Sequence, residues 1–204
     1  MIKNIIFDMG GVLRVFDRDY FVSRFGLNEE DKKILMNEIF LSVEWSMMDR
    51  GTLKDVEACE RVKKNLPDHL KEYADTLVLH WEDLSYPMPG MADLVKELKD
   101  NGYGIYLLSN ASKRLHDYWP KLPGNEYFDG KIVSCDYKVV KPQNEIYQLL
   151  NTKFNLNLNE CLFIDDTTIN VEGAIYNGLD GIVFHGDVKE LRRKLNNKGI
   201  NISL

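Results

Sequence analysis

The stretch 4-NIIFDMGGVLRVFD-17 decides how the rest of the chain is interpreted. It starts with a short apolar run, stops at a carboxylate, Asp8, and then turns through Gly10 and Gly11. An apolar run of this length that ends at a polar residue and a turn indicates a buried parallel strand. If Asp8 carries chemistry, a second carboxylate two residues later could share the work, and Gly10 supplies none.

Similar apolar runs, each bounded by turn or polar residues, occur at residues 2–7, 103–109, 131–135, 160–164 and 181–185. Helical patterns alternate with them at residues 91–101, 143–153, 168–177 and 187–197. The alternation predicts an α/β fold with a doubly wound parallel sheet, Rossmann-like, and right-handed crossovers between the strands.

Residues 17–84 interrupt this alternation. Apolar residues there repeat at helical spacing over several segments, which predicts a helical insertion between the first and second strands. The segment 86-YPMPG-90 then marks a turn or hinge on the way back to the sheet. We therefore predict a Rossmann-like core formed by residues 1–16 and 85–204, and a helical cap formed by residues 17–84.

The composition limits the classes of function. Of the 204 residues, 44% are hydrophobic and 28% are charged, which suits a folded chain with a sizeable core. The formal net charge of -6 disfavours nucleic acid and anionic membranes as partners, but a local basic pocket could still bind a small anion. No apolar run approaches the roughly 20 residues that cross a bilayer, and MIKNIIF lacks the pattern of a secretory signal. The three cysteines, Cys59, Cys135 and Cys161, are widely spaced, which fits free buried thiols in a reducing compartment, so we expect a cytoplasmic protein. The sequence does not specify the oligomeric state.

Polar side chains follow the first four expected strands. They are Asp8, Ser109 with Asn110, Lys141, and Asp165 with Asp166. Because the carboxyl ends of parallel strands share one edge of the sheet, these groups should meet there. Carboxylates suit Mg²⁺, while ammonium, hydroxyl and amide groups can neutralise and orient a phosphate. A divalent cation would also relieve the repulsion between the carboxylates and keep Asp8 ionised for attack on phosphorus.

Four stretches, in order and at fitting spacing, resemble the motifs of one known family: 5-IIFDMGGVL-13, 107-LLSNAS-112, 139-VVKPQNEIY-147 and 162-LFIDDTTINVEGA-174. Over nearly its full length the chain is similar to the haloacid dehalogenase-like hydrolases, whose smaller cap type follows the first motif. The resemblance implies that Asp8 is phosphorylated by the substrate. It also implies that Ser109 and Asn110 bind the transferring phosphoryl group, and that Lys141 steadies the phosphate and the nucleophile.

The resemblance further implies a Mg²⁺ site. Its ligands would be Asp8, the backbone carbonyl of Gly10 and Asp166, with Asp165 in support either directly or through water. A carbonyl ligand does not depend on the side chain, so glycine at position 10 is compatible with this site.

Gly10 nevertheless departs from most phosphatases of that family, which have aspartate there to protonate the leaving group and later deprotonate water. Such help is typically worth ~10²- to 10⁴-fold in rate, so either the enzyme is slower or another group replaces the acid. We rank a bound water first as the replacement, ahead of Asp17 or Asp19 at the entrance to the cap. The FDxGxV form of the first motif resembles a branch that hydrolyses phosphorylated sugars, including sugar 1-phosphates, whose less basic leaving group depends less on an acid.

These patterns predict a Mg²⁺-dependent phosphatase that acts on a small phosphorylated metabolite through an aspartyl-phosphate, with a sugar phosphate as the leading candidate. One alternative is a catalytically weakened member that binds a phosphometabolite or regulates another protein. A phosphomutase and a haloacid dehalogenase are further alternatives. Dehalogenase chemistry needs no metal, so it leaves the adjacent carboxylates of Asp165 and Asp166 unexplained.

The sequence leaves two questions open about residues in and next to the cap. Trp45, Met47 and Met48 either line a substrate pocket or pack helices against one another. Arg14 and Arg50 either contact a polar end of the substrate or face solvent.

Overall fold

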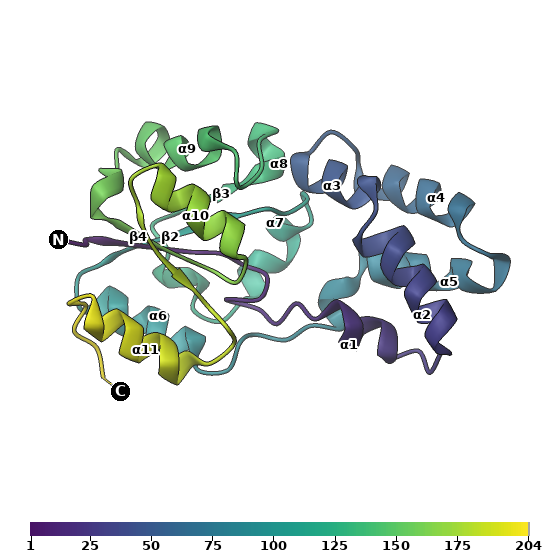
Figure 1. The fold of residues 1–204 in the computed structure, drawn as a ribbon, viewed down its shortest axis with the longest axis horizontal. Helices are drawn as coiled ribbons and strands as arrows, with labels where there is room; N and C mark the ends of the chain where they lie inside the picture. The colour runs from purple at the N-terminus through teal and green to yellow at the C-terminus, as the bar shows by residue number, and fades with distance from the viewer. Residues whose placement is uncertain (204) are drawn as a thin grey trace.

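The computed structural model describes residues 1–203, which form a parallel sheet flanked by helices and joined to a group of cap helices (Figure 1). The strands are β1 (Asn4–Phe7), β2 (Gly104–Ser109), β3 (Gly130–Val133), β4 (Cys161–Asp165) and β5 (Asp180–Val183). They pair in the order β3-β2-β1-β4-β5, and every pairing is parallel. β1 is therefore central, and the predicted Rossmann-like α/β fold is confirmed.

The end of β3 differs from the expectation. The strand stops at Val133, and the short helix α8 (Ser134–Tyr137) begins at once, although the apolar run continues to Cys135. The hydroxyl of the fully buried Ser134 accepts a hydrogen bond from the N–H of Ala111, 2.9 Å away. Ser134 therefore turns toward the loop after β2 instead of continuing the ladder.

Helices cover both faces of the sheet (Figure 1). On one face α6 (Met91–Asp100) and α11 (Val188–Asn197) pack with α7 (Leu115–Tyr118), and this layer buries Ile5 and Phe7 of β1. On the other face α9 (Asn144–Phe154) and α10 (Thr168–Tyr176) bury Ile6. Successive residues of β1 thus face opposite layers, which explains why the whole strand is apolar. Short 3-10 turns complete the core: η5 (Trp119–Lys121), η6 (Asn125–Tyr127) and η7 (Leu158–Glu160).

The cap helices between β1 and α6 have an apolar cluster of their own. They are α1 (Arg18–Ser23), α2 (Glu29–Leu35), α3 (Val43–Arg50), α4 (Asp55–Asn65) and α5 (Lys71–Ala74). Single turns of other helical type connect them: η1 (Met36–Phe40), η2 (Asp68–Leu70), η3 (Asp75–Leu79) and η4 (Trp81–Asp83). The boundaries at residues 17 and 84 stay predictions, and the separate cluster supports them.

Two further expectations concern composition. The three cysteines are free thiols and are buried, as predicted. Across residues 1–203, the structure has no helix with both the length and the apolar character to cross a bilayer.

The two chain segments that join the cap to the core run side by side as a hinge. The N–H of Val15 donates to the carbonyl of Tyr86 at 2.9 Å, and that of Met88 donates to Leu13 at 3.0 Å. Arg14 fastens the hinge, because its Nε donates to the hydroxyl of Ser85 at 2.9 Å and its Nη2 donates to the carbonyl of the same residue at 3.0 Å. Nη2 also donates to a carbonyl of η4, so Arg14 binds the hinge and does not face solvent.

Replacing Arg14 by lysine should destabilise the protein. Hydrogen bonds from a charged donor contribute ~1.5–3 kcal/mol, and a lysine ammonium cannot reproduce the fork of a guanidinium. We therefore expect the free energy of unfolding, measured by urea titration of tryptophan fluorescence, to fall by about 2 kcal/mol. The exposed Arg24→Lys is a matched control that should change it by less than about 0.5 kcal/mol. Equal stability of the two variants would contradict this role for Arg14.

Candidate active site

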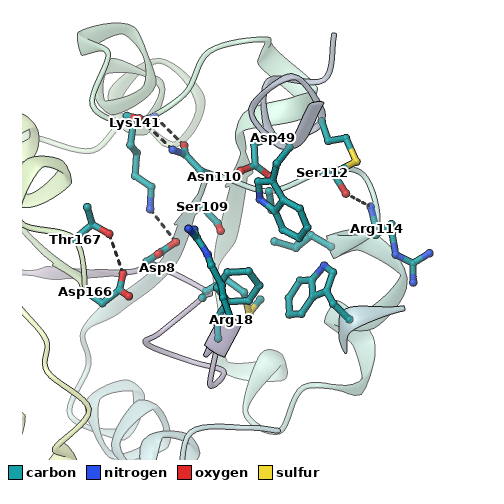
Figure 2. A pocket seen from close by; sticks show the side chains of 18 of the residues that line it. Asp8, Arg18, Asp49, Ser109, Asn110, Ser112, Arg114, Lys141, Asp166 and Thr167 are labelled. Carbon is teal, nitrogen blue, oxygen red and sulfur yellow. Dashed lines mark hydrogen bonds and ion pairs between the residues drawn. The ribbon is translucent and has the colours of Figure 1, made fainter. Parts of the chain in front are cut away.

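A cavity of about 300 Å³ lies where the carboxyl ends of the strands meet the cap. The core contributes most of the polar part of its lining, and both core and cap contribute apolar residues (Figure 2). The predicted site residues that line the cavity are Asp8, Gly10, Ser109, Asn110, Lys141 and Asp166. Asp165 lies directly behind them and is fully buried. The side chains predicted from the strand ends are therefore together in space.

A buried cation lies between two carboxylates at the base of the cavity. The Nζ atom of Lys141 is 2.8 Å from Oδ1 of Asp8 and 2.6 Å from Oδ2 of Asp165. The contact with Asp165 is a hydrogen bond, whereas the contact with Asp8 is an ion pair outside hydrogen-bond geometry. Nζ also donates to the carbonyl of Leu108 at 3.1 Å. One ammonium thus neutralises part of the charge of both carboxylates.

Burial controls the protonation of this group. It raises the pKa of Asp8 to about 7, and the negative charges of Asp165 and Asp166 add to the effect of burial, while Lys141 opposes it. For Lys141 burial acts to lower the pKa, but the carboxylates of Asp165 and Asp8 outweigh it, so the pKa lies above its usual value of 10.5. Lys141 is therefore an ammonium at neutral pH. More positive charge near Asp8 would complete its ionisation.

The loop that carries Lys141 is tied to the loop after β2. The backbone N–H of Lys141 donates to Oδ1 of Asn110 at 2.8 Å, and Nδ2 of Asn110 returns a hydrogen bond to the carbonyl of Lys141 at 3.1 Å. Ser109 precedes this pair and is 1% exposed. The reciprocal bonds fix the Asn110 amide and the start of the Lys141 side chain in one arrangement.

Asp165 is held by its own loop. Its Oδ1 accepts from the N–H of Thr167 at 2.8 Å, and Nδ2 of Asn170 lies 3.1 and 3.2 Å from the two carboxylate oxygens. The carbonyl of Asn170 in turn accepts from the hydroxyl of Tyr147 at 2.7 Å. Both oxygen atoms of Asp165 therefore accept hydrogen bonds, and Asn170 ties the loop after β4 to the start of α10.

The two glycines of the first motif have different surroundings. Gly11 has a φ of +74°, and a Cβ there would lie 2.2 Å from Oδ2 of Asp166, so only glycine fits. At Gly10 an added Cβ would meet only Phe16, at an ordinary contact distance of 3.5 Å. The neighbouring hydrogen bonds join Gly11 N to Arg14 O and Arg14 N to Met9 O. They bypass the carbonyl of Gly10, which leaves that oxygen free to act as a ligand.

The acidic groups at this edge fit a divalent cation. One carboxylate oxygen from each of Asp8, Asp165 and Asp166 lies within 4.8 Å of the others. Burial and the charge of Asp165 also raise the pKa of Asp166. Carboxylates that repel one another and already share an ammonium offer the hard oxygen donors that Mg²⁺ prefers.

The cap supplies functional residues that the sequence did not single out. Arg18, in the first turn of α1, and Asp49, in the last turn of α3, both line the cavity (Figure 2). Trp45 and Met48 also line it, while Met47 packs against the cap cluster. Trp45 and Met48 therefore both line the cavity and pack in the cap, whereas Met47 only packs.

Other cap candidates lie elsewhere. Arg50 donates to Oε1 of Gln143 at 3.1 Å and bridges cap and core outside the cavity. Asp17 is exposed and caps α1 by accepting from the N–H of Tyr20 at 2.9 Å, and Asp19 is exposed beside it. Neither aspartate lines the cavity.

Comparison with known proteins identifies the family of the chain. A family model of haloacid dehalogenase-like hydrolases matches residues 2–178, which include strands β1 to β4, the cap and every residue named around the cavity. The chain belongs to the haloacid dehalogenase-like hydrolases. The expected family and the expected hydrolase class are confirmed.

Relatives of this haloacid dehalogenase-like hydrolase cover most of its length. A sesquiterpene phosphatase of Aspergillus oryzae is 25% identical over 187 residues, which are 88% of either chain. D-ribitol-5-phosphate phosphatase of Bacteroides thetaiotaomicron is 26% identical over 187 residues, 84% of this chain and 86% of that one. A crystal structure of a HAD family enzyme from Bacteroides thetaiotaomicron, in complex with magnesium and inorganic phosphate, has a TM-score of 0.72 at 22% identity. It covers 94% of this chain and 99% of its own, and it supports the fold.

Proposed function

We propose that this chain is a Mg²⁺-dependent phosphatase that hydrolyses a small phosphorylated metabolite through phosphorylation of Asp8. The observation that carries the proposal is the carboxylate of Asp8, 8% exposed at the base of the cavity and 2.8 Å from the ammonium of Lys141. Two relatives that cover most of the chain are phosphatases by name, which supports the same reaction.

The side chains around Asp8 suit phosphoryl transfer. Its carboxylate would attack phosphorus, and the bond from phosphorus to the ester oxygen would break as the new bond forms. Lys141, Ser109 and Asn110 would hold the phosphoryl oxygens, because each places a donor group on the cavity wall. Hydrogen bonds to backbone atoms fix the side chains of Lys141 and Asn110 before substrate arrives, which reduces the reorganisation needed for reaction.

Mg²⁺ would be held by Asp8, the carbonyl of Gly10 and Asp166. When bound it would supply positive charge that neutralises the phosphoryl group. We assign Asp165 a supporting role, because its oxygens already accept hydrogen bonds from Lys141, Thr167 and Asn170. Asp165 would then orient Lys141 and the loop that carries Asp166.

The cavity favours a substrate with an apolar face next to its phosphate. Trp45 and Trp81 form part of the wall, and the C–H faces of a sugar ring pack well on indole. A sugar phosphate therefore remains the finer proposal, and a larger apolar group such as an isoprenyl chain is the competing substrate. A cytoplasmic location, and the exclusion of nucleic acid and membrane as partners, stay predictions.

A panel of phosphate monoesters tests the reaction. We expect phosphate release from at least one sugar phosphate or isoprenyl phosphate, measured by a colorimetric phosphate assay, and complete loss of release in EDTA. Addition of Mg²⁺ in excess of EDTA should restore it, because a carboxylate site without its cation cannot neutralise the phosphoryl group. Binding of esters without turnover, at any metal concentration, would favour the phosphometabolite-binding alternative.

A further inference from the structure

Asp49 is the acidic residue that the cap contributes to the cavity. It lies in the last turn of α3 and is half-buried. In Figure 2 it lies beyond Ser109 and Asn110, whereas Asp166 and Thr167 are on the other side of Asp8. A carboxyl group in this place would face the part of a bound ester that points away from the metal ligands and toward the cap.

The backbone of Asp49 is fixed to the core. Its carbonyl accepts a hydrogen bond from the hydroxyl of Ser134, which is fully buried. The same hydroxyl accepts from the N–H of Ala111, the residue after Asn110. Gly51 closes α3 with a φ of +74°, and a Cβ there would lie 2.2 Å from the carbonyl oxygen of Cys135. The end of α3 is therefore packed directly against the loop that follows Ser109 and Asn110.

The surroundings of Asp49 favour its neutral form. Burial raises its pKa to about 7; Arg18 of α1 and Lys141 oppose this, and the charges of Asp8 and Asp55 add to it. A carboxyl group with a pKa near the working pH can donate a proton in one step and accept one in the next.

We propose that Asp49 is the general acid and base of the reaction, in the place of the carboxylate that Gly10 lacks. The inference rests on the proposed phosphatase function. As Asp8 attacks phosphorus and the ester bond breaks, Asp49 gives its proton to the departing oxygen, which leaves as an alcohol. Asp49 then takes a proton from the water whose oxygen attacks the phosphorus of phosphorylated Asp8. Phosphate leaves, the carboxylate of Asp8 is restored, and Asp49 is neutral again.

The assignment explains how the chain can retain Asp8, Lys141 and the paired acidic residues while having glycine at position 10. The acid comes from the cap, so it reaches the leaving group only when α3 is packed on Ser134. A bound water, the replacement ranked first from the sequence, would need a protein group to set its proton affinity, and Asp49 is the cap carboxyl group in reach of the cavity.

Asp49→Asn tests the proposal with two leaving groups. Asparagine has the same shape and cannot exchange the proton. For an alkyl phosphate, kcat/KM should fall by ~10²-fold or more, because the alkoxide cannot leave unprotonated. With p-nitrophenyl phosphate the leaving group needs no proton, so rapid mixing should show a burst of p-nitrophenol that approaches one per active site. Slow steady-state release should follow, because hydrolysis of phosphorylated Asp8 has lost its base.

A retained burst would show that Asp49→Asn is folded and that its Asp8 still reacts. Glu44→Gln removes a carboxylate from the first turn of the same helix, outside the cavity, and should behave as the wild type on both substrates. The proposal is overturned if Asp49→Asn leaves alkyl phosphate hydrolysis unchanged, or if it removes the burst together with all activity. If the wild-type protein hydrolyses neither ester, it is the phosphatase function itself that fails.

Discussion

Asp8→Asn should abolish phosphate release while leaving the fold intact. Asparagine retains the shape of the side chain but is not a nucleophile, and loss of a covalent nucleophile costs roughly 10⁴-fold or more in kcat. The thermal midpoint of unfolding should stay level or rise, because the wild-type carboxylate is buried and its pKa is already raised to about 7. Lys141 would still pair with Asp165 at 2.6 Å.

Two measurements check this expectation. Phosphate release is followed on the best ester of the panel, and unfolding is followed by circular dichroism during heating. Asp19→Asn, an exposed aspartate outside the cavity, is the matched control and should retain full activity. Activity of Asp8→Asn within tenfold of the wild type would reject the covalent mechanism.

Lys141→Met should damage both stability and activity. The ammonium contacts Asp8 and Asp165, and the side chains of Lys141 and Asp165 are no more than 1% exposed. Removing one partner of a buried ion pair typically costs ~3–5 kcal/mol, because it leaves charge buried without compensation. We expect the free energy of unfolding in EDTA to fall by about that amount, and hydrolysis to be lost along with the donor to the phosphate.

Magnesium should separate the two effects of Lys141→Met. A cation among the three carboxylates would replace part of the lost positive charge, so millimolar Mg²⁺ should recover part of the stability but none of the hydrolysis. Lys189→Met, an exposed lysine of α11, should shift stability by less than about 0.5 kcal/mol. If Mg²⁺ raises the free energy of unfolding of the wild type and of Lys141→Met by the same amount, the cation does not replace the positive charge of Lys141 among the carboxylates.

The sheet and the core half of the site could be predicted from the sequence for one physical reason. A strand such as β1 is buried on both faces, so it appears in the sequence as an unbroken apolar run. Parallel strands bring the residues at their carboxyl ends to one edge of the sheet, whichever side chains those residues have. Asp8, Ser109 and Lys141 are therefore placed by topology. The details of their contacts, including the shared ammonium, needed side-chain positions.

The cap half could not be predicted in the same way. Helical spacing identifies an apolar face, but Asp49 lies between Met48 and Arg50 with nothing local to mark it. Its position depends on the hydrogen bond from Ser134, 85 residues away in the chain. Arg14 shows the reverse case, because a cation close to the nucleophile in sequence turned out to fasten the hinge.

The unequal surroundings of Gly10 and Gly11 bear on how such an enzyme can change over time. Position 11 is closed to every side chain, but position 10 has an ordinary backbone conformation and room for a Cβ. A single base change converts any glycine codon into one for aspartate or glutamate, so an acid at position 10 is one mutation away, and its Cβ would meet only Phe16 at an ordinary contact distance. In evolution, the general acid could thus move between position 10 of the loop and Asp49 of the cap, while the nucleophile, the lysine and the metal ligands keep their positions.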